Sequence, residues 1–202
     1  EFYMKKLIVT NTSVLLPDLT IAENRTVETE NGVISVIRPY QKGEESAAAE
    51  DTERLDGTGK LLMPGLCDSH MHTGQQLLKG QILDALPMIW TRIMLPFEST
   101  LTPEKMELNA ELAALEMIKS GTTAFVDAGS YFMENAADVY LQSGLRGLLS
   151  ASTMDDASLP DSIRHTADQA VGQTDALYDA YNGKGNLKVA YSLRSLISCS
   201  ED

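Results

Sequence analysis

The chain has 202 residues, 43% hydrophobic and 22% charged, a composition that excludes collagen-like, low-complexity and wholly disordered chains. Its 29 acidic residues outnumber the 16 basic ones, and the net charge of -13 repels phosphate backbones, which disfavours nucleic-acid binding. No apolar run approaches the length of a membrane span and no secretory signal begins the chain, so the sequence predicts a cytoplasmic protein that does not enter membranes.

Residues 1–62 are predicted to be rich in β-strands. Asn31-Gly32 separates two of the candidate strands, and this pair predicts a tight hairpin because both residues tolerate positive φ. The acidic, small and polar segment Gln41–Arg54 is predicted to be a solvated loop. The strand candidates are Lys6–Thr10, Ser13–Leu16, Arg25–Glu30 and Val33–Arg38.

From Leu61 onward the pattern changes to strands that alternate with longer helices. The clearest helix is Thr102–Ser120, which has Thr102 as a candidate N-cap, Pro103 in its first turn and Gly121 after its end. Such a β-α-β series predicts a parallel sheet with right-handed crossovers, which is an α/β fold. The other elements are predicted at Leu61–His72, Thr122–Ala128, Arg146–Ser152 and Leu187–Leu193 as strands, and at Tyr131–Ser143 and Ser162–Tyr181 as helices.

Two of the three histidines, His70 and His72, stand two residues apart at the end of a predicted strand. Side chains alternate along a strand, so the two imidazoles face the same way, about 6.6 Å apart along it. Imidazoles so placed can converge on one cation, and Asp68 on the same face could support them by hydrogen bonding. The alternative is a pair of histidines that merely occupies a surface strand end. The apolar strand and the βα series that follows it favour the metal site.

Several segments, in this order and spacing, resemble the amidohydrolase superfamily. More narrowly, they resemble its branch of deaminases and chlorohydrolases that act on purines, pyrimidines and triazines. Each segment alone is weakly specific, whereas their combination extends over nearly the whole chain. The segments are Leu55–His72, Leu77–Gly80 (LLKG), Leu86–Trp90, Leu95–Glu98 (LPFE), Ser120–Asp127 and Tyr191–Asp202.

The resemblance implies a metal-dependent (β/α)8 barrel of the TIM type together with a small β-sandwich domain. Residues 1–62 would then be the N-terminal part of the sandwich, and residues 63–202 the first four βα units of the barrel. It implies one divalent ion, zinc in the first place or iron, with His70 and His72 as its first two ligands. The metal would ionise a water that attacks the amino-bearing carbon of a purine-like ring, with loss of ammonia.

The resemblance also implies substrate-binding roles for Gln75, Trp90, Glu98 and Arg194. Gln75 and Arg194 stand where guanine deaminases carry a glutamine and an arginine, which favours a keto-purine, while an adenosine derivative stays open as the substrate. The guanidinium could donate two hydrogen bonds to a carbonyl or ring nitrogen. Trp90 could stack on a ring but could equally pack within a helix, and Glu98 could bind a ribose hydroxyl or ring N–H but could equally form an ion pair.

The family's remaining metal ligands and its general acid/base would lie beyond Asp202, so no catalytic residue is assigned within the chain. The sequence therefore predicts the N-terminal portion of an enzyme for a small-molecule substrate, inactive as it stands. A lactam-opening or dechlorinating amidohydrolase stays open, as does a half-barrel that binds a metal or partner without catalysis. A homo-oligomer and a complementing C-terminal half also stay open as partners.

Overall fold

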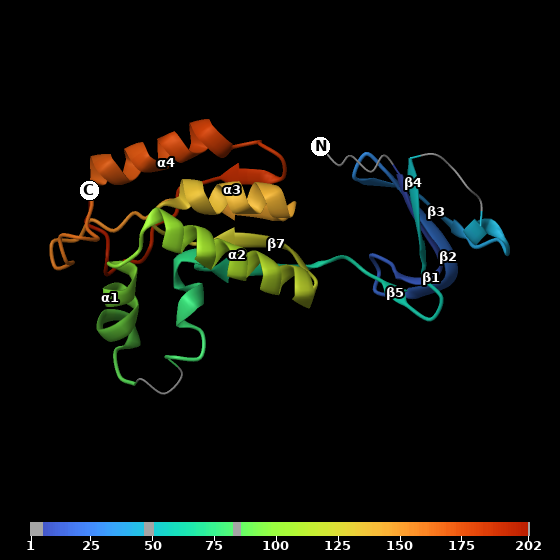
Figure 1. The fold of residues 1–202 in the computed structure, drawn as a ribbon, viewed down its shortest axis with the longest axis horizontal. Coiled ribbons are helices and arrows are strands. Elements are labelled where there is room, and N and C mark those ends of the chain that lie inside the picture. The colour runs from blue at the N-terminus through green and yellow to red at the C-terminus, as the bar shows by residue number, and fades with distance from the viewer. Residues whose placement is uncertain (1–5, 47–50, 83–85, 202) are drawn as a thin grey trace. The chain divides into compact units, whose positions relative to one another are not determined.

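The computed structural model describes residues 6–46, 51–82 and 86–201, in two compact units that divide between Pro64 and Gly65 (Figure 1). Within these described ranges, no helix has both the length and the apolar character that crossing a membrane requires.

The first unit contains a five-stranded sheet in which β1 is central. β2 and β3 continue from β1 as an antiparallel meander, while β4 and β5 pair with β1 in parallel. The predicted hairpin at Asn31-Gly32 is confirmed, and both residues have positive φ, 51° and 77°. The strands are β1 (Lys6–Leu15), β2 (Ile21–Glu30), β3 (Val33–Pro39), β4 (Thr52–Asp56) and β5 (Leu61–Leu62).

Several of the predicted bounds in this unit are wrong, and β2 begins at Ile21, four residues before the predicted Arg25. The strands predicted at Lys6–Thr10 and Ser13–Leu16 form one strand, because an irregularity around Asn11, with φ 51°, lets pairing with β2 resume after a register shift. The predicted loop Gln41–Arg54 contains a 3-10 turn, η1 (Glu44–Ser46), and the start of β4. β4 is polar in sequence, and it is pairing with β1 that makes it a strand.

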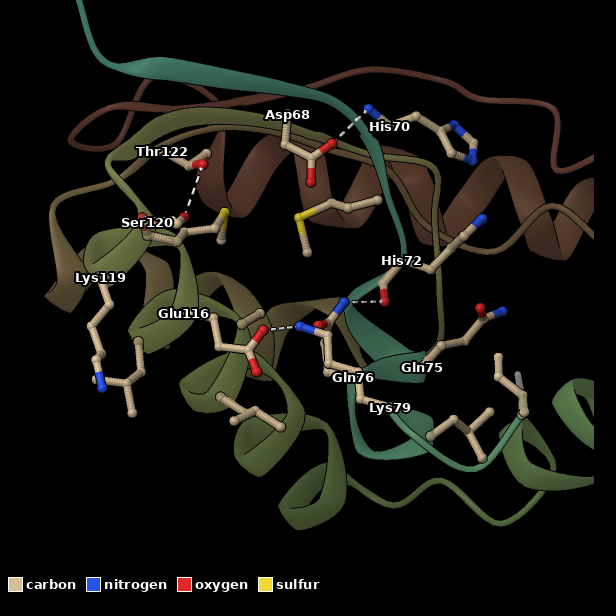
Figure 2. A pocket seen from close by; sticks show the side chains of 17 residues that line it. Asp68, His70, His72, Gln75, Gln76, Lys79, Glu116, Lys119, Ser120 and Thr122 are labelled. Carbon is tan, nitrogen blue, oxygen red and sulfur yellow. Dashed lines mark hydrogen bonds and ion pairs between the residues drawn. The ribbon is translucent and has the colours of Figure 1, made fainter. Parts of the chain in front are cut away.

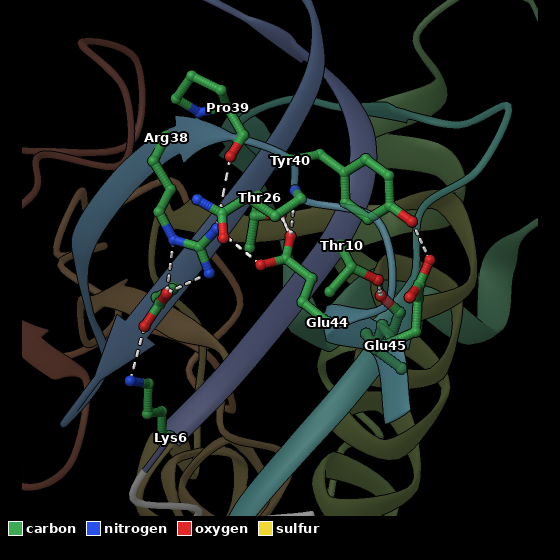
Figure 3. A network of polar contacts seen from close by, with 11 residues as sticks. Lys6, Thr10, Thr26, Arg38, Pro39, Tyr40, Glu44 and Glu45 are labelled. Carbon is green, nitrogen blue, oxygen red and sulfur yellow. Dashed lines mark hydrogen bonds and ion pairs between the residues drawn. The ribbon is translucent and has the colours of Figure 1, made fainter. Parts of the chain in front are cut away.

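Arg38 connects two glutamates through ion pairs, and its side chain is partly exposed (Figure 3). Its guanidinium lies 2.9 Å from Glu28 Oε1 and 2.7 Å from Glu44 Oε2, and Lys6 lies 2.6 Å from the other oxygen of Glu28. The bond from Lys6, helped by Arg38, holds the pKa of Glu28 below its ordinary value. Burial opposes ionisation of Glu44, but bonds from Thr26 and Arg38 still lower its pKa. This network ties η1 to β1, β2 and β3.

We expect Arg38→Met to lower the stability of this sheet by about 1.5 to 3 kcal/mol at pH 7, the range for a hydrogen bond to a charged group. Because the pKa values of Glu28 and Glu44 are lowered by folding, their contribution is present above the unfolded value of about 4.3 and is lost as pH falls below it. Hydrogen exchange of the β2 amides at pH 7 and at pH 3 measures the effect, and the difference between variant and wild type should shrink in acid.

The control for this prediction is Lys42→Met, which removes a cation from an exposed side chain beside η1. It should leave β2 exchange within error of wild type at both pH values. If Arg38→Met lowers the stability of the sheet as much at pH 3 as at pH 7, packing of the arginine stem, and not the ion pairs, holds the network.

The second unit is built on a four-stranded parallel sheet in the order β6-β7-β8-β9. Helices α2, α3 and α4 each lie between two successive strands of this sheet in the chain, and Figure 1 shows them along one face of the sheet. This order confirms the predicted α/β series. The strands are β6 (Leu66–Met71), β7 (Thr122–Asp127), β8 (Arg146–Leu149) and β9 (Leu187–Val189). The helices are α1 (Leu95–Glu98), α2 (Pro103–Ser120), α3 (Met133–Ser143) and α4 (Ala167–Tyr181), with η2 (Thr73–Leu78) and a π-helical turn η3 (Trp90–Met94) before α1.

Several elements of this unit differ from their predicted bounds. The strand predicted at Leu61–His72 is broken after Leu62, because β5 pairs with β1 whereas β6 pairs with β7, and Pro64 between them has no N–H for a ladder. α4 begins five residues later than predicted, because Thr166 and Gln169 form a capping box that fixes its start. The predicted α2 is confirmed, with the Thr102 hydroxyl accepting from the Lys105 N–H and Gly121 at φ 80°.

The core of this unit lies between the sheet and helices α2 and α3. Small side chains on both helices, Ala110 and Ala136 among them, are fully buried and let the helices approach closely. Larger side chains fill the space over the strands, and the Phe125 and Tyr140 rings lie 4.4 Å apart. This packing fixes the carboxyl ends of β6 and β7, where the polar residues gather.

Candidate active site

His70 and His72 lie at the carboxyl end of β6, where Figure 2 shows both side chains leaving the strand on the same side. Their ring centroids are 5.0 Å apart and the rings are perpendicular. His70 is exposed and His72 is partly buried. Asp68 Oδ1 accepts the backbone N–H of His70 at 3.2 Å, so Asp68 supports the strand backbone here. Two imidazoles are therefore side by side at the edge of the parallel sheet.

The donor set of this pair fits a divalent cation. Nδ1 of His72 is buried and has no hydrogen-bond partner among the described residues, a cost that a bound ligand would offset. Burial, helped by the positive charge of Arg194, lowers the pKa of His72, so its imidazole is neutral, the form that binds metals. Within residues 6–46, 51–82 and 86–201 no third His, Cys, Asp or Glu joins them in a metal-binding group.

A buried ion pair lies beside the histidines. Arg194 Nη2 is 2.6 Å from Glu98 Oε1, and their side chains are only 4% and 1% exposed. Gln75 donates its amide to the same carboxylate oxygen, and Arg194 Nη1 donates to the Gly129 carbonyl at 2.8 Å. Glu98 thus holds both Gln75 and Arg194, which come from η2 and from the segment after β9.

A pocket of about 350 Å³ brings together five of the six residues predicted for the site. Glu98 lies outside its lining, since its carboxylate is buried against Arg194 and Gln75. Trp90 is half-buried and contacts the small apolar cluster of Leu95, Met154, Leu159 and Ile163, so it both packs and faces the pocket. The lining residues are His70, His72, Gln75, Trp90, Met94, Arg194, Ser195 and Ile197.

A second, larger pocket of about 880 Å³ opens on the other side of β6, toward α2 (Figure 2). It shares His70, His72 and Gln75 with the smaller pocket, and its far wall carries Glu116 and Lys119. The histidines therefore stand where the two pockets meet, along the outer edge of the sheet.

Arg194 is bound by groups of the protein itself in this structure. Both of its terminal nitrogens donate to protein acceptors, the Glu98 carboxylate and the Gly129 carbonyl. Its backbone N–H also donates to the Thr153 hydroxyl at 3.0 Å. Arg194 could donate two hydrogen bonds to a substrate carbonyl only by giving up these bonds. The arrangement therefore favours a role for Arg194 as part of the pocket wall that orients Glu98 and Gln75.

The sequence prediction missed a buried polar group directly behind His72. Asp127, at the end of β7, is 0% exposed, and it accepts from both the backbone and the hydroxyl of Thr73. The Tyr140 hydroxyl lies 2.7 Å from the same threonine hydroxyl. Burial raises the pKa of Asp127, while the bonds from Thr73 and Gly129 oppose that rise. The available signal was a lone aspartate ending an apolar strand.

His70 and His72 lie at the carboxyl end of a parallel strand, which is where α/β barrels build their active sites. Residues 61–201 match the Amidohydrolase family, and the chain belongs to that family. Its β6–β9 sheet is accordingly the first half of a (β/α)8 barrel.

The curated relatives include deaminases of adenosine derivatives. The chain is 36% identical over 170 residues to the 5-methylthioadenosine/S-adenosylhomocysteine deaminase of Thermococcus kodakarensis, covering 83% of this chain and 36% of that protein. It is 33% identical over 204 residues to the 5'-deoxyadenosine deaminase of Methanosarcina acetivorans, covering 98% and 44%. The chain spans less than half the length of these relatives.

Solved structures agree with this fold. An adenosine deaminase from Xanthomonas campestris, determined with bound zinc, has a TM-score of 0.78 and 27% identity, covering 92% of this chain and 42% of that one. A guanine deaminase from C. acetobutylicum, with guanine in its active site, has a TM-score of 0.82 over 96% of this chain and 48% of its own, at 18% identity. At that identity the second likeness concerns the fold alone.

Proposed function

We propose that the protein is a metal-dependent aminohydrolase that deaminates the purine ring of an adenosine derivative. The observation that carries this proposal is the pocket in which His70 and His72 stand together with Gln75, Trp90 and Arg194. The relatives named as deaminases of adenosine derivatives support the substrate class. A guanine-like substrate is the weaker candidate, because Gln75 and Arg194 direct their donors at Glu98 and Gly129.

His70 and His72 would hold one divalent ion, with zinc as the first candidate and iron as the second. Such an ion, when bound, lowers the pKa of a water and so supplies a nucleophile near neutral pH. The chain's own contribution is to keep His72 neutral by burial and to keep both rings on one side of β6. Further ligands and the general acid/base would come from the rest of the protein or from a complementing half.

The remaining pocket residues would bind and orient the ring. Trp90 offers an aromatic face, held by the apolar cluster at its back, on which a purine can stack. Gln75 forms part of the wall beside the histidines, and its amide orientation is fixed by Glu98. Arg194 supplies positive charge at the pocket wall and holds the Glu98 side chain in place through their ion pair.

The test is ammonia release by the zinc-loaded full-length protein with 5'-methylthioadenosine, adenosine and guanine. We expect release from the adenosine compounds and little or none from guanine. The control is the His70→Ala, His72→Ala double variant, which should release none. Release from guanine alone would move the assignment to keto-purines. No ammonia from any of the three, with metal bound, would reject deamination and direct attention to chloride release from a chlorotriazine or to lactam opening.

A further inference from the structure

Asp127 is a buried carboxylate placed where the chain leaves β6 and turns into η2. It ends β7, and its backbone is in register with Met71, the residue before His72. The Ala128 N–H donates to the Met71 carbonyl at 2.9 Å, which extends the ladder up to the histidine. Asp127, Thr73 and Tyr140 are each fully buried, so no water shares their bonds at the surface. The ladder therefore fixes the chain just before His72.

The chain just after His72 is fixed by the carboxylate itself. Asp127 Oδ2 accepts the Thr73 N–H at 2.9 Å and also the Thr73 hydroxyl, while Oδ1 accepts the Gly129 N–H at 2.8 Å. Thr73 begins η2, and His72 is the residue that precedes its first turn. One carboxylate thus joins the residue after His72 to the loop after β7.

The neighbouring packing leaves this turn little freedom. A Cβ added at Gly74 would lie 2.2 Å from the Ser130 hydroxyl oxygen, so the backbone after Thr73 is pressed against the loop after β7. Because both sides of His72 are held to the end of β7, a change in the bonds of Asp127 changes where the His72 ring points. Mutating a group that sets the orientation of a metal-binding imidazole typically lowers the metal affinity by about 10- to 100-fold.

We propose that Asp127 is a positioning residue that, through Thr73, aims the His72 imidazole toward the cation shared with His70. This inference rests on the metal site of the proposed function. Asp127 itself touches neither metal nor substrate in this role. Carboxylate oxygens accept from all three groups at once, whereas an asparagine would present an NH2 group to one of the donors and push it away.

The experiment measures zinc affinity of the full-length protein by competition with a chromophoric chelator, together with the visible spectrum of the cobalt-substituted protein. We expect Asp127→Asn to lower zinc affinity about tenfold or more and to change the cobalt spectrum. Thr73→Val, which keeps the backbone bond but removes the hydroxyl, should lower affinity less. Thr73→Ser, which keeps both bonds to Asp127, should retain the zinc affinity of wild type. Tyr140→Phe, which leaves the bonds to Asp127 intact, should stay within about threefold of wild type.

The outcomes separate this inference from the metal site itself. If His72→Ala retains zinc, the proposed metal site is wrong. If His72→Ala loses zinc while folded Asp127→Asn and Thr73→Val bind zinc and cobalt as wild type does, only the positioning role is wrong. If the role of Asp127 were purely structural, Asp127→Asn would lower the free energy of unfolding but leave the zinc affinity and the cobalt spectrum of the folded protein unchanged. Should Asp127→Asn fail to fold, Thr73→Val against Thr73→Ser decides the question.

Discussion

Replacing His72 with alanine is expected to lower the zinc affinity of the full-length protein by more than about 100-fold, beyond what loss of a ligand's supporting partner costs. The reason is that His72 is the better fixed of the two imidazoles: it is partly buried, neutral, and has an unpartnered Nδ1 among the described residues. His70 is exposed, so replacing it with alanine should lower the zinc affinity of the protein somewhat less. Metal content after dialysis and chelator competition measure both variants.

The third histidine supplies a matched control. His165 lies beside the Tyr131 ring, at 5.6 Å between centroids, and its Nε2 is also buried without a partner in the described ranges. Burial lowers its pKa as well. The His165→Ala variant should bind zinc as wild type does, because the residue is far in sequence from β6 and lines a different pocket, with Gln173 and Tyr181. Stoichiometric zinc in His72→Ala would refute the ligand assignment.

Much of the secondary structure of both units could be predicted because its signals are local. Helix α2 carries its own start and stop in Thr102, Pro103 and Gly121, and the structure reproduces them. The hairpin at Asn31-Gly32 is likewise predicted from two adjacent residues. Strand alternation alone places His70 and His72 on one side of β6, as the structure shows. Such features depend on backbone propensity and caps within a few residues of sequence.

The features that could not be predicted depend on partners far away in the chain. β4 is polar and becomes a strand by pairing with β1, about 45 residues earlier. Glu98 and Arg194 are 96 residues apart, and nothing local tells whether each faces a substrate or the other. Asp127 is an ordinary strand-end residue until the fold brings Thr73 to it. Tertiary contacts of this kind decide what a polar side chain does, and a single sequence does not contain them.

The ion pair between Arg194 and Glu98 carries the largest expected effect on stability. With side chains 4% and 1% exposed, neither charge can turn to water when its partner is removed. We expect Arg194→Met to lower the free energy of unfolding by about 3 to 5 kcal/mol, the cost of leaving one charge buried and unpaired. Gln75 remains bound to Glu98, but its neutral amide replaces only a small part of the lost charge interaction.

A double-mutant cycle distinguishes the charge effect from lost packing. In the Arg194→Met background, Glu98→Gln removes the stranded charge, so the double variant should recover part of the stability that the single change lost. Denaturant unfolding of the full-length protein measures all four forms, and Arg146→Met, which changes an exposed arginine at the start of β8, should stay within about 0.5 kcal/mol of wild type. Strictly additive losses would show that Arg194 stabilises the site through its packing. Recovery would show that the charge interaction with Arg194 holds Glu98 in place, and therefore that the orientation of Gln75 in the pocket depends on a residue that follows β9.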